Sequence, residues 1–206
     1  MKKGIIAVMI MFLMGCSSET IQSTPEPTET ATTGVLGCGV EEECDDGERA
    51  DMSGYEGFTD EEHVFVSATM SEVNSYFEKD ETFVVYFGFS SCPWCKEAAP
   101  ILNDIAKEFD RRVLYVDTRL DGDDIRVETN SDYVQLMELV QEYVEKDESG
   151  NEFLYVPAVY FVKDGEVVSY NIGTVGTHDA TERVMTEEEV ELLKVVYRSG
   201  FELGKK

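Results

Sequence analysis

The feature that most constrains the fold is a continuous run of aromatic and β-branched residues over 82–89, followed closely by Cys92 and Pro93. A run without polar alternation is typical of a strand buried on both faces, in a sheet that carries helices on each side. Proline is favoured in the first turn of a helix, so Pro93 indicates a helix start directly after that strand. The segment therefore predicts a strand-to-helix junction with Cys92 at the N-terminus of the helix.

Similar patterns predict further strands and helices around this junction. Two helix starts are marked by capping boxes, and Lys163-Asp164-Gly165 predicts a tight hairpin turn. We expect strands at 63–68, 82–89, 112–117, 156–162 and 166–170, and helices at 69–79, 93–109, 131–146 and 186–201. Strands that alternate with helices and end in a hairpin and a helix predict an α/β sandwich around a mixed central sheet.

The N-terminus has the composition of a bacterial export signal. Lys2 and Lys3 precede a short apolar run from Ile5 to Met14, which is too short to span a bilayer stably. The run ends in Leu-Met-Gly-Cys16, which resembles a lipobox and implies cleavage after residue 15 and lipidation of Cys16. Ordinary secretion with an incidental cysteine is the alternative. We expect a protein anchored by lipid to the extracytoplasmic face of the cell membrane, in a Gram-positive bacterium.

The chain divides into three segments by composition. Residues 17–55 lack apolar periodicity and are rich in Thr, Pro, Glu and Gly. We therefore expect a signal peptide over 1–15, a disordered acidic tether over 16–57 and one globular domain over 58–206.

An odd count of five cysteines is unusual in an exported chain. Lipidation of Cys16 leaves two local pairs, Cys38 with Cys44 and Cys92 with Cys95. The first pair is interpreted as a structural disulfide in the tether, with a second redox pair as the alternative; the three acids between these cysteines would raise a thiol pKa. A zinc site made by both pairs is disfavoured by the loose spacing of the first, and we expect neither metal nor cofactor.

The position of Cys92 indicates its chemistry. A thiol at a helix N-terminus faces unpaired N–H groups and the positive end of the helix dipole, which favour the thiolate. Cys95 lies one turn inside the helix, close enough to form a disulfide with Cys92. We expect Cys92 to be the nucleophile and Cys95 the resolving thiol.

The sequence around these cysteines resembles the thioredoxin family. Cys92-Pro93-Trp94-Cys95-Lys96 and the following Pro100 resemble its active-site helix, and Val156-Pro157 with Lys163 to Val167 resembles its cis-proline loop and hairpin. The resemblance implies a thioredoxin-like three-layer fold, with Pro157 in cis beside Cys92. It also implies that the Val156 backbone pairs with a client peptide, and we place Trp94 at the rim as a substrate contact. The layout of lipobox, tether and domain is similar to that of bacteriocin transport accessory proteins.

Three departures from the thioredoxin pattern leave the direction of electron flow open. Tyr86 stands where thioredoxins usually have a buried acid, and we expect it to fill the core. Ser91 replaces a tryptophan, and Pro93-Trp94 replaces Gly-Pro. The chain also has an insertion over 118–155, with an acidic loop at 121–124 that lacks the spacing of a calcium site.

The net charge of −26 excludes nucleic-acid binding, because few basic residues are present to neutralise phosphates. His63 and His178 have no partner motif, and we expect them at surface or cap positions. The expected function is a monomeric thiol–disulfide oxidoreductase that acts on extracytoplasmic protein thiols and disulfides and exchanges electrons with an unidentified redox partner. The alternative is a non-catalytic accessory module that docks on a peptide exporter.

Overall fold

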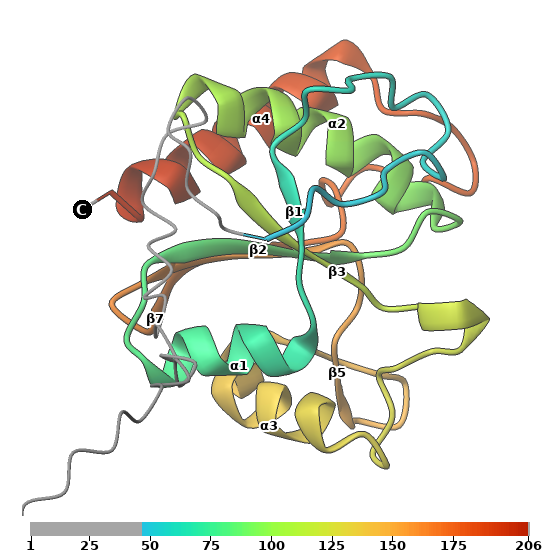
Figure 1. The fold of residues 1–206 in the computed structure, drawn as a ribbon. Coiled ribbons are helices and arrows are strands. Elements are labelled where there is room, and N and C mark those ends of the chain that lie inside the picture. Colours follow the sequence, from blue (N-terminus) through green and yellow to red (C-terminus); the bar gives the residue numbers. More distant parts are fainter. Residues whose placement is uncertain (1–46, 206) are drawn as a thin grey trace, which may run out of the picture. The chain divides into compact units, whose positions relative to one another are not determined.

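The computed structural model describes residues 47–205, without the side chain of Asp121. The predicted signal peptide, lipidation at Cys16 and the Cys38–Cys44 pair lie outside the described residues. The core is a five-stranded sheet with the order β1-β3-β2-β6-β7 (Figure 1). The first three of these run parallel, and β6 and β7 run antiparallel to their neighbours. The strands are β1 (Phe65–Ser67), β2 (Phe83–Gly88), β3 (Val113–Asp117), β6 (Ala158–Lys163) and β7 (Glu166–Ile172).

Two pairs of helices cover the sheet, one pair on each face, so the domain has the predicted three layers (Figure 1). Alternate residues of β2 enter the two resulting cores: Tyr86 packs on the α2 and α4 side, whereas Val85 and Phe87 pack on the α1 and α3 side. This explains why the strand has no polar face. The helices are α1 (Met70–Glu78), α2 (Pro93–Glu108), α3 (Ser131–Val140) and α4 (Glu187–Leu203).

The predicted helix starts and hairpin turn are confirmed. Both capping boxes form, at Thr69 with Glu72 and at Thr186 with Glu189. The β6–β7 turn has Asp164 and Gly165 at φ values of 50° and 75°, the left-handed conformation that a two-residue hairpin loop requires.

The predicted helix over 131–146 is too long. It ends at Val140, a 3₁₀ turn covers Gln141–Tyr143, and a small hairpin follows from β4 (Glu145–Lys146) and β5 (Glu152–Phe153). The ring of Tyr143 packs against Tyr170, and its carbonyl accepts a hydrogen bond of 3.3 Å from the Tyr160 hydroxyl. These tertiary contacts end the helix, although the apolar pattern continues to Val144.

The ordered domain begins earlier than the predicted boundary at residue 58. Ala50, Met52 and Tyr55 are buried in the α2–α4 core, and the amide of Ala50 donates to the carbonyl of Phe65 at 3.1 Å. The expected tether is therefore wrong for its last residues, because these apolar side chains cover the outer strand β1. A short segment with few apolar residues gives no periodicity that would reveal such packing.

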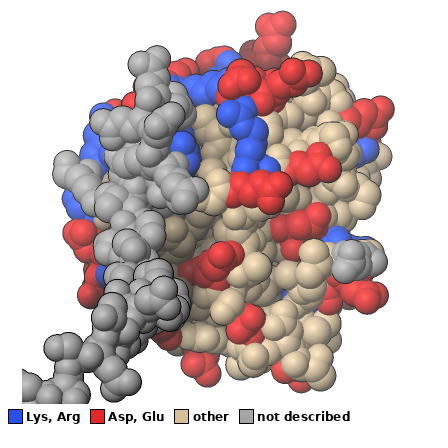
Figure 2. Space-filling view, in the orientation of Figure 1, with Lys and Arg blue, Asp and Glu red and all other residues tan. Residues whose placement is uncertain are grey.

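Acidic side chains are prominent on the face of the domain that Figure 2 shows. Figure 2 shows Asp and Glu side chains scattered over the visible face among uncharged residues, instead of gathered in one patch. Within residues 47–205, no helix has the length and apolarity needed to cross a bilayer.

Candidate active site

Cys92 occupies the N-cap of α2, where β2 has just ended at the centre of the sheet. Its backbone is extended, with φ −75° and ψ 122°, and Pro93 begins the helix. The Cys92 sulfur accepts a hydrogen bond of 3.3 Å from the backbone N–H of Cys95. The sequence therefore places the first cysteine on the free N–H groups of the helix, as a side-chain cap does.

The pKa values of the two thiols are shifted in opposite directions. The hydrogen bond with the Cys95 side chain lowers the pKa of Cys92 to about 7, against the opposing effect of burial. Backbone N–H groups of Cys95 and Trp94 and the positive charge of Arg126 contribute smaller parts of this decrease in the pKa. Burial raises the pKa of Cys95 far above its usual value, and the neighbouring Cys92 adds to this increase. At neutral pH the arrangement therefore holds one reactive thiolate beside one protonated, buried thiol.

The Val156–Pro157 peptide bond is cis, as the thioredoxin resemblance implied. The Cys92 thiol donates to the carbonyl oxygen of Val156, with a sulfur–oxygen distance of 3.8 Å. Pro157 is buried and Val156 is half-buried. The structure thus brings the two predicted motifs to one place.

The other residues near the motif have separate environments. Trp94 is half-buried and packs against the α2–α4 core, and Ser91 is exposed. Lys96 forms an ion pair of 3.0 Å with Glu56 on the surface. Among the described residues, no three His, Cys, Asp or Glu side chains are grouped so that they could hold a metal ion.

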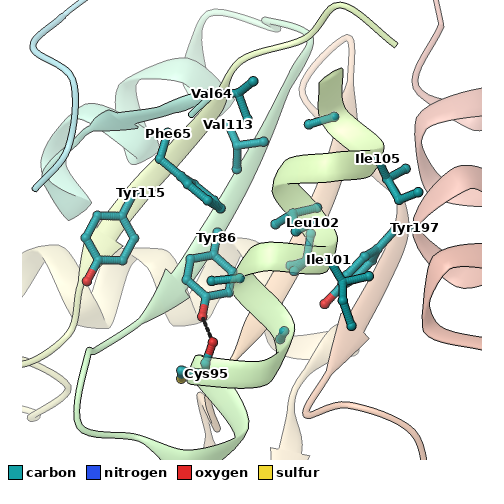
Figure 3. Close-up of a cluster of buried hydrophobic side chains, with 14 of the residues drawn as sticks. Val64, Phe65, Tyr86, Cys95, Ile101, Leu102, Ile105, Val113, Tyr115 and Tyr197 are labelled. Carbon is teal, nitrogen blue, oxygen red and sulfur yellow. Dashed lines mark hydrogen bonds between the residues drawn. The ribbon is translucent and has the colours of Figure 1, made fainter. Parts of the chain in front are cut away.

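Tyr86 fills the core, as expected, but its hydroxyl also reaches the site. The side chain is fully buried, and the hydroxyl donates to the backbone carbonyl of Cys95 at 3.3 Å (Figure 3). Burial raises the pKa of this phenol well above its usual value. A phenol, and not a carboxylate, therefore stands beside the resolving cysteine.

Arg126, in the insertion, is a site residue that the sequence analysis missed. It is 9% exposed, and its guanidinium donates to the Asp124 carboxylate at 2.6 and 2.9 Å. It also donates to the carbonyl of Leu154 at 2.9 Å and packs 4.9 Å from the centre of the Phe153 ring. Arg126 therefore connects the first part of the insertion to its end, next to Val156 and Pro157. No local pattern distinguishes this arginine from a surface one; the nearby Asp124 is the only hint.

The prediction of surface or cap positions is wrong for His178, which is buried between α2 and the loop over 173–186. Its Nε2 lies 2.9 Å from the carbonyl of Arg183 and 3.3 Å from the carboxylate of Glu97, so this nitrogen carries a proton. The hydroxyl of Thr174 lies 2.7 Å from Nδ1. His178 thus links the loop over 173–186 to helix α2 through hydrogen bonds.

His63 is also buried, and its Nδ1 accepts a hydrogen bond from the amide of Phe65 at 3.2 Å.

No family model matches the chain, and no curated protein matches it. Among solved structures, it is similar to oxidized thioredoxin O2 from Arabidopsis thaliana, with 17% identity, a TM-score of 0.37, and coverage of 60% of this chain and 91% of that one. It is also similar to thioredoxin from Schistosoma mansoni, with 20% identity, a TM-score of 0.34, and coverage of 54% and 84%. Reduced desulfothioredoxin from Desulfovibrio vulgaris Hildenborough has 22% identity, a TM-score of 0.32, and coverage of 62% and 88%.

Similarity at this level concerns the fold, and we transfer no residue role from it. The strand order, the helices on both faces and the cis-proline loop beside the N-terminus of α2 are features of this chain itself. Together they give the chain a thioredoxin-like fold, with Cys92 and Cys95 at the end of its central strand.

Proposed function

We propose that this protein is an extracytoplasmic thiol–disulfide oxidoreductase in which Cys92 is the nucleophile and Cys95 the resolving thiol. The observation that carries the proposal is the position of the Cys92 sulfur at the N-cap of α2. There it accepts the Cys95 N–H at 3.3 Å and has a pKa of about 7. A thiol of this acidity is about half ionised at pH 7, far more than an ordinary cysteine, without losing its nucleophilicity.

The reaction proceeds by two exchanges. The Cys92 thiolate attacks one sulfur of a client disulfide, the client S–S bond breaks, and the other client sulfur leaves as a thiolate. Cys95 then loses its proton and attacks the Cys92 sulfur. The mixed disulfide breaks, the Cys92–Cys95 disulfide forms, and two electrons have passed to the client. The reverse sequence oxidises a client dithiol.

The loop before Pro157 is the proposed docking place for the client backbone. The Val156 carbonyl lies 3.8 Å from the nucleophilic sulfur, and Val156 is only half-buried. An extended client segment beside this loop would place its disulfide next to Cys92. Trp94, half-buried at the start of α2, is proposed to contact the client side chains.

The proposed location rests on the N-terminal sequence. Lipidation of Cys16 would anchor the chain to the outer face of the membrane, and residues 17–46 would link the anchor to the domain. The clients would then be exported proteins, which form disulfides in oxidising compartments.

Catalysis of insulin disulfide reduction by the chain from residue 17 onward tests the proposal, with Cys38 and Cys44 replaced by serine so that only the site thiols remain. We expect Cys92→Ala to abolish catalysis and Lys96→Ala to leave it unchanged, since the Lys96 ammonium pairs with Glu56 at the surface. If the protein with Cys92 and the Cys92→Ala variant were equally inactive, the result would contradict the oxidoreductase proposal and favour the non-catalytic accessory module.

A further inference from the structure

The insertion over 118–155 carries an unusual share of the exposed apolar side chains. It contains only 38 of the 159 described residues. Yet five of the ten large apolar side chains that are exposed in the described part lie in it: Leu120, Val127, Val134, Leu139 and Tyr155. Apolar side chains gathered on one segment of the surface are typical of a place where another molecule binds. The insertion is therefore where a binding surface is to be sought.

Tyr155 is the member of this set that adjoins the candidate active site. It directly precedes Val156, whose carbonyl oxygen lies 3.8 Å from the sulfur of Cys92. Consecutive Cα atoms are only about 3.8 Å apart, so Tyr155 cannot lie far from the nucleophile. The residue is 38% exposed, although an aromatic ring loses free energy in water. A client that reaches Cys92 along the Val156 backbone would therefore meet this ring.

Contacts within the insertion hold Tyr155 in place. Its ring packs edge-to-face against Phe153, with centroids 5.1 Å apart and an angle of 74° between the planes. The guanidinium of Arg126 packs 4.9 Å from the centre of the Phe153 ring and donates to the carbonyl of Leu154 at 2.9 Å. The aromatic pair of Phe153 and Tyr155 is thus ordered before any client arrives, which lowers the entropy lost on binding.

The charges next to the aromatic pair indicate what kind of side chain it accepts. Arg126 is buried, and its guanidinium forms an ion pair of 2.6 Å with Asp124. Arg119 packs over a different ring, that of Phe89, at 4.6 Å from its centre. The positive charge behind Phe153 is therefore neutralised within the insertion and does not favour an acidic client. The pair offers a client aromatic surface, which an apolar side chain covers best.

The geometry of an extended client defines which of its residues meets the pair. During exchange the client cysteine must contact the sulfur of Cys92, and the client backbone beside it would pair with Val156. One residue of extended chain advances about 3.3 Å, so the residue next to the client cysteine is the one within reach of Tyr155. Its side chain would be covered by the aromatic pair while the sulfurs react.

We propose that Phe153 and Tyr155 determine client specificity, and that they select segments with a large apolar side chain next to the reactive cysteine. The inference rests on the proposed function and gives the insertion a role in it. The exchange at Cys92 is the same for every client. Burial of the apolar side chain against the aromatic pair accompanies this step only in the preferred clients, so it accelerates their reaction over that of polar ones.

Two short peptides with blocked termini test the selection, one with phenylalanine and one with serine on both sides of a cysteine that is disulfide-bonded to thionitrobenzoate. The reduced chain from residue 17 onward, with Cys38 and Cys44 replaced by serine, is mixed rapidly with each. The Cys92 thiolate attacks the peptide sulfur, the S–S bond breaks, and the coloured thionitrobenzoate leaves. We expect the phenylalanine peptide to react about tenfold faster. Tyr155→Ser should reduce this ratio to about twofold or less, and Tyr155→Phe should retain it.

Tyr170→Ser is the matched control. Tyr170 is 46% exposed but lies on the edge strand β7, where its ring packs on Tyr143 and Tyr160, so the ratio should stay near tenfold. Unfolding of part of a variant would slow both peptides alike and leave the ratio unchanged. A tenfold ratio that persists in Tyr155→Ser, a similar loss in Tyr170→Ser, or equal rates of both peptides with the unsubstituted insertion would overturn the inference. Release of colour from neither peptide would instead contradict the proposed function.

Discussion

The sulfur of Cys92 lies 3.8 Å from the carbonyl oxygen of Val156, 64 residues further along the chain. The sheet explains this proximity. Strands β2 and β6 are antiparallel, with Phe87 paired to Ala158, so the end of one strand meets the start of the other. The residues just beyond these ends, Cys92 and Val156, therefore converge at one edge of the sheet.

The acidity of Cys92 predicts a specific pH profile for alkylation. With a pKa of about 7, its reaction with iodoacetamide should level off above that pH and fall about tenfold for each pH unit below it. In the unfolded chain, the same profile should give the ordinary cysteine pKa near 8.5. The rate should be followed by mass spectrometry of the peptide that contains Cys92. A profile for the folded protein that coincides with the unfolded one would contradict the thiolate stabilisation.

Arg126→Met should destabilise the domain by about 2 kcal/mol, because it removes the 2.6 Å ion pair with Asp124 and leaves the Leu154 carbonyl without its arginine donor. It should also raise the pKa of Cys92, since a positive charge is lost. Arg119→Met is the control: this arginine is half-exposed and lies 3.8 Å from Asp124, so we expect a change below about 1 kcal/mol. Urea unfolding measures the stability of each variant. Equal stabilities of the two variants would refute the role of Arg126.

The early start of the domain predicts a strong effect of truncation. A chain that begins at residue 58 loses the buried side chains of Ala50, Met52 and Tyr55, and with them on the order of 4 kcal/mol of stability. A chain that begins at residue 47 retains these contacts. Thermal unfolding of the two chains compares them directly, and identical midpoints would show that the segment does not contribute to the core.

The contact between α4 and the sheet predicts the effect of Gly200→Ala. An added Cβ would lie 2.4 Å from the Phe161 ring, so the helix must shift away from β6. We expect a loss of about 2 kcal/mol, in spite of the better helix propensity of alanine. Gly204→Ala is the control, because its nearest neighbour would be a carbonyl oxygen at 3.5 Å. A more stable Gly200→Ala protein would mean that the contact is not tight.

Local patterns were sufficient to predict the parts of the fold that depend on neighbouring residues. The capping boxes at Thr69 and Thr186, the turn at Asp164 and the helix start at Pro93 are fixed by short-range chemistry. The end of α3 at Val140 was not predictable in this way, because contacts of Tyr143 with β6 and β7 decide it.

The candidate site was predictable in its motifs but not in its surroundings. The cysteines and Val156-Pro157 were recognised from sequence patterns. Arg126 was not, because it reaches the site from a segment without apolar periodicity. For Tyr86, the sequence indicated a buried ring, but the hydrogen bond to Cys95 depends on the space left by Gly88.

The measurement that tests the central claim most directly is covalent trapping of a client. Cys95→Ser and Cys92→Ser proteins, in the Cys38→Ser and Cys44→Ser background, are each mixed with a disulfide-containing peptide and analysed by intact mass. The account predicts that Cys95→Ser accumulates a peptide adduct on Cys92, because the resolving thiol is missing, and that Cys92→Ser remains unmodified, because Cys95 is buried and protonated. Equal adducts on both variants, or none on either, would contradict it.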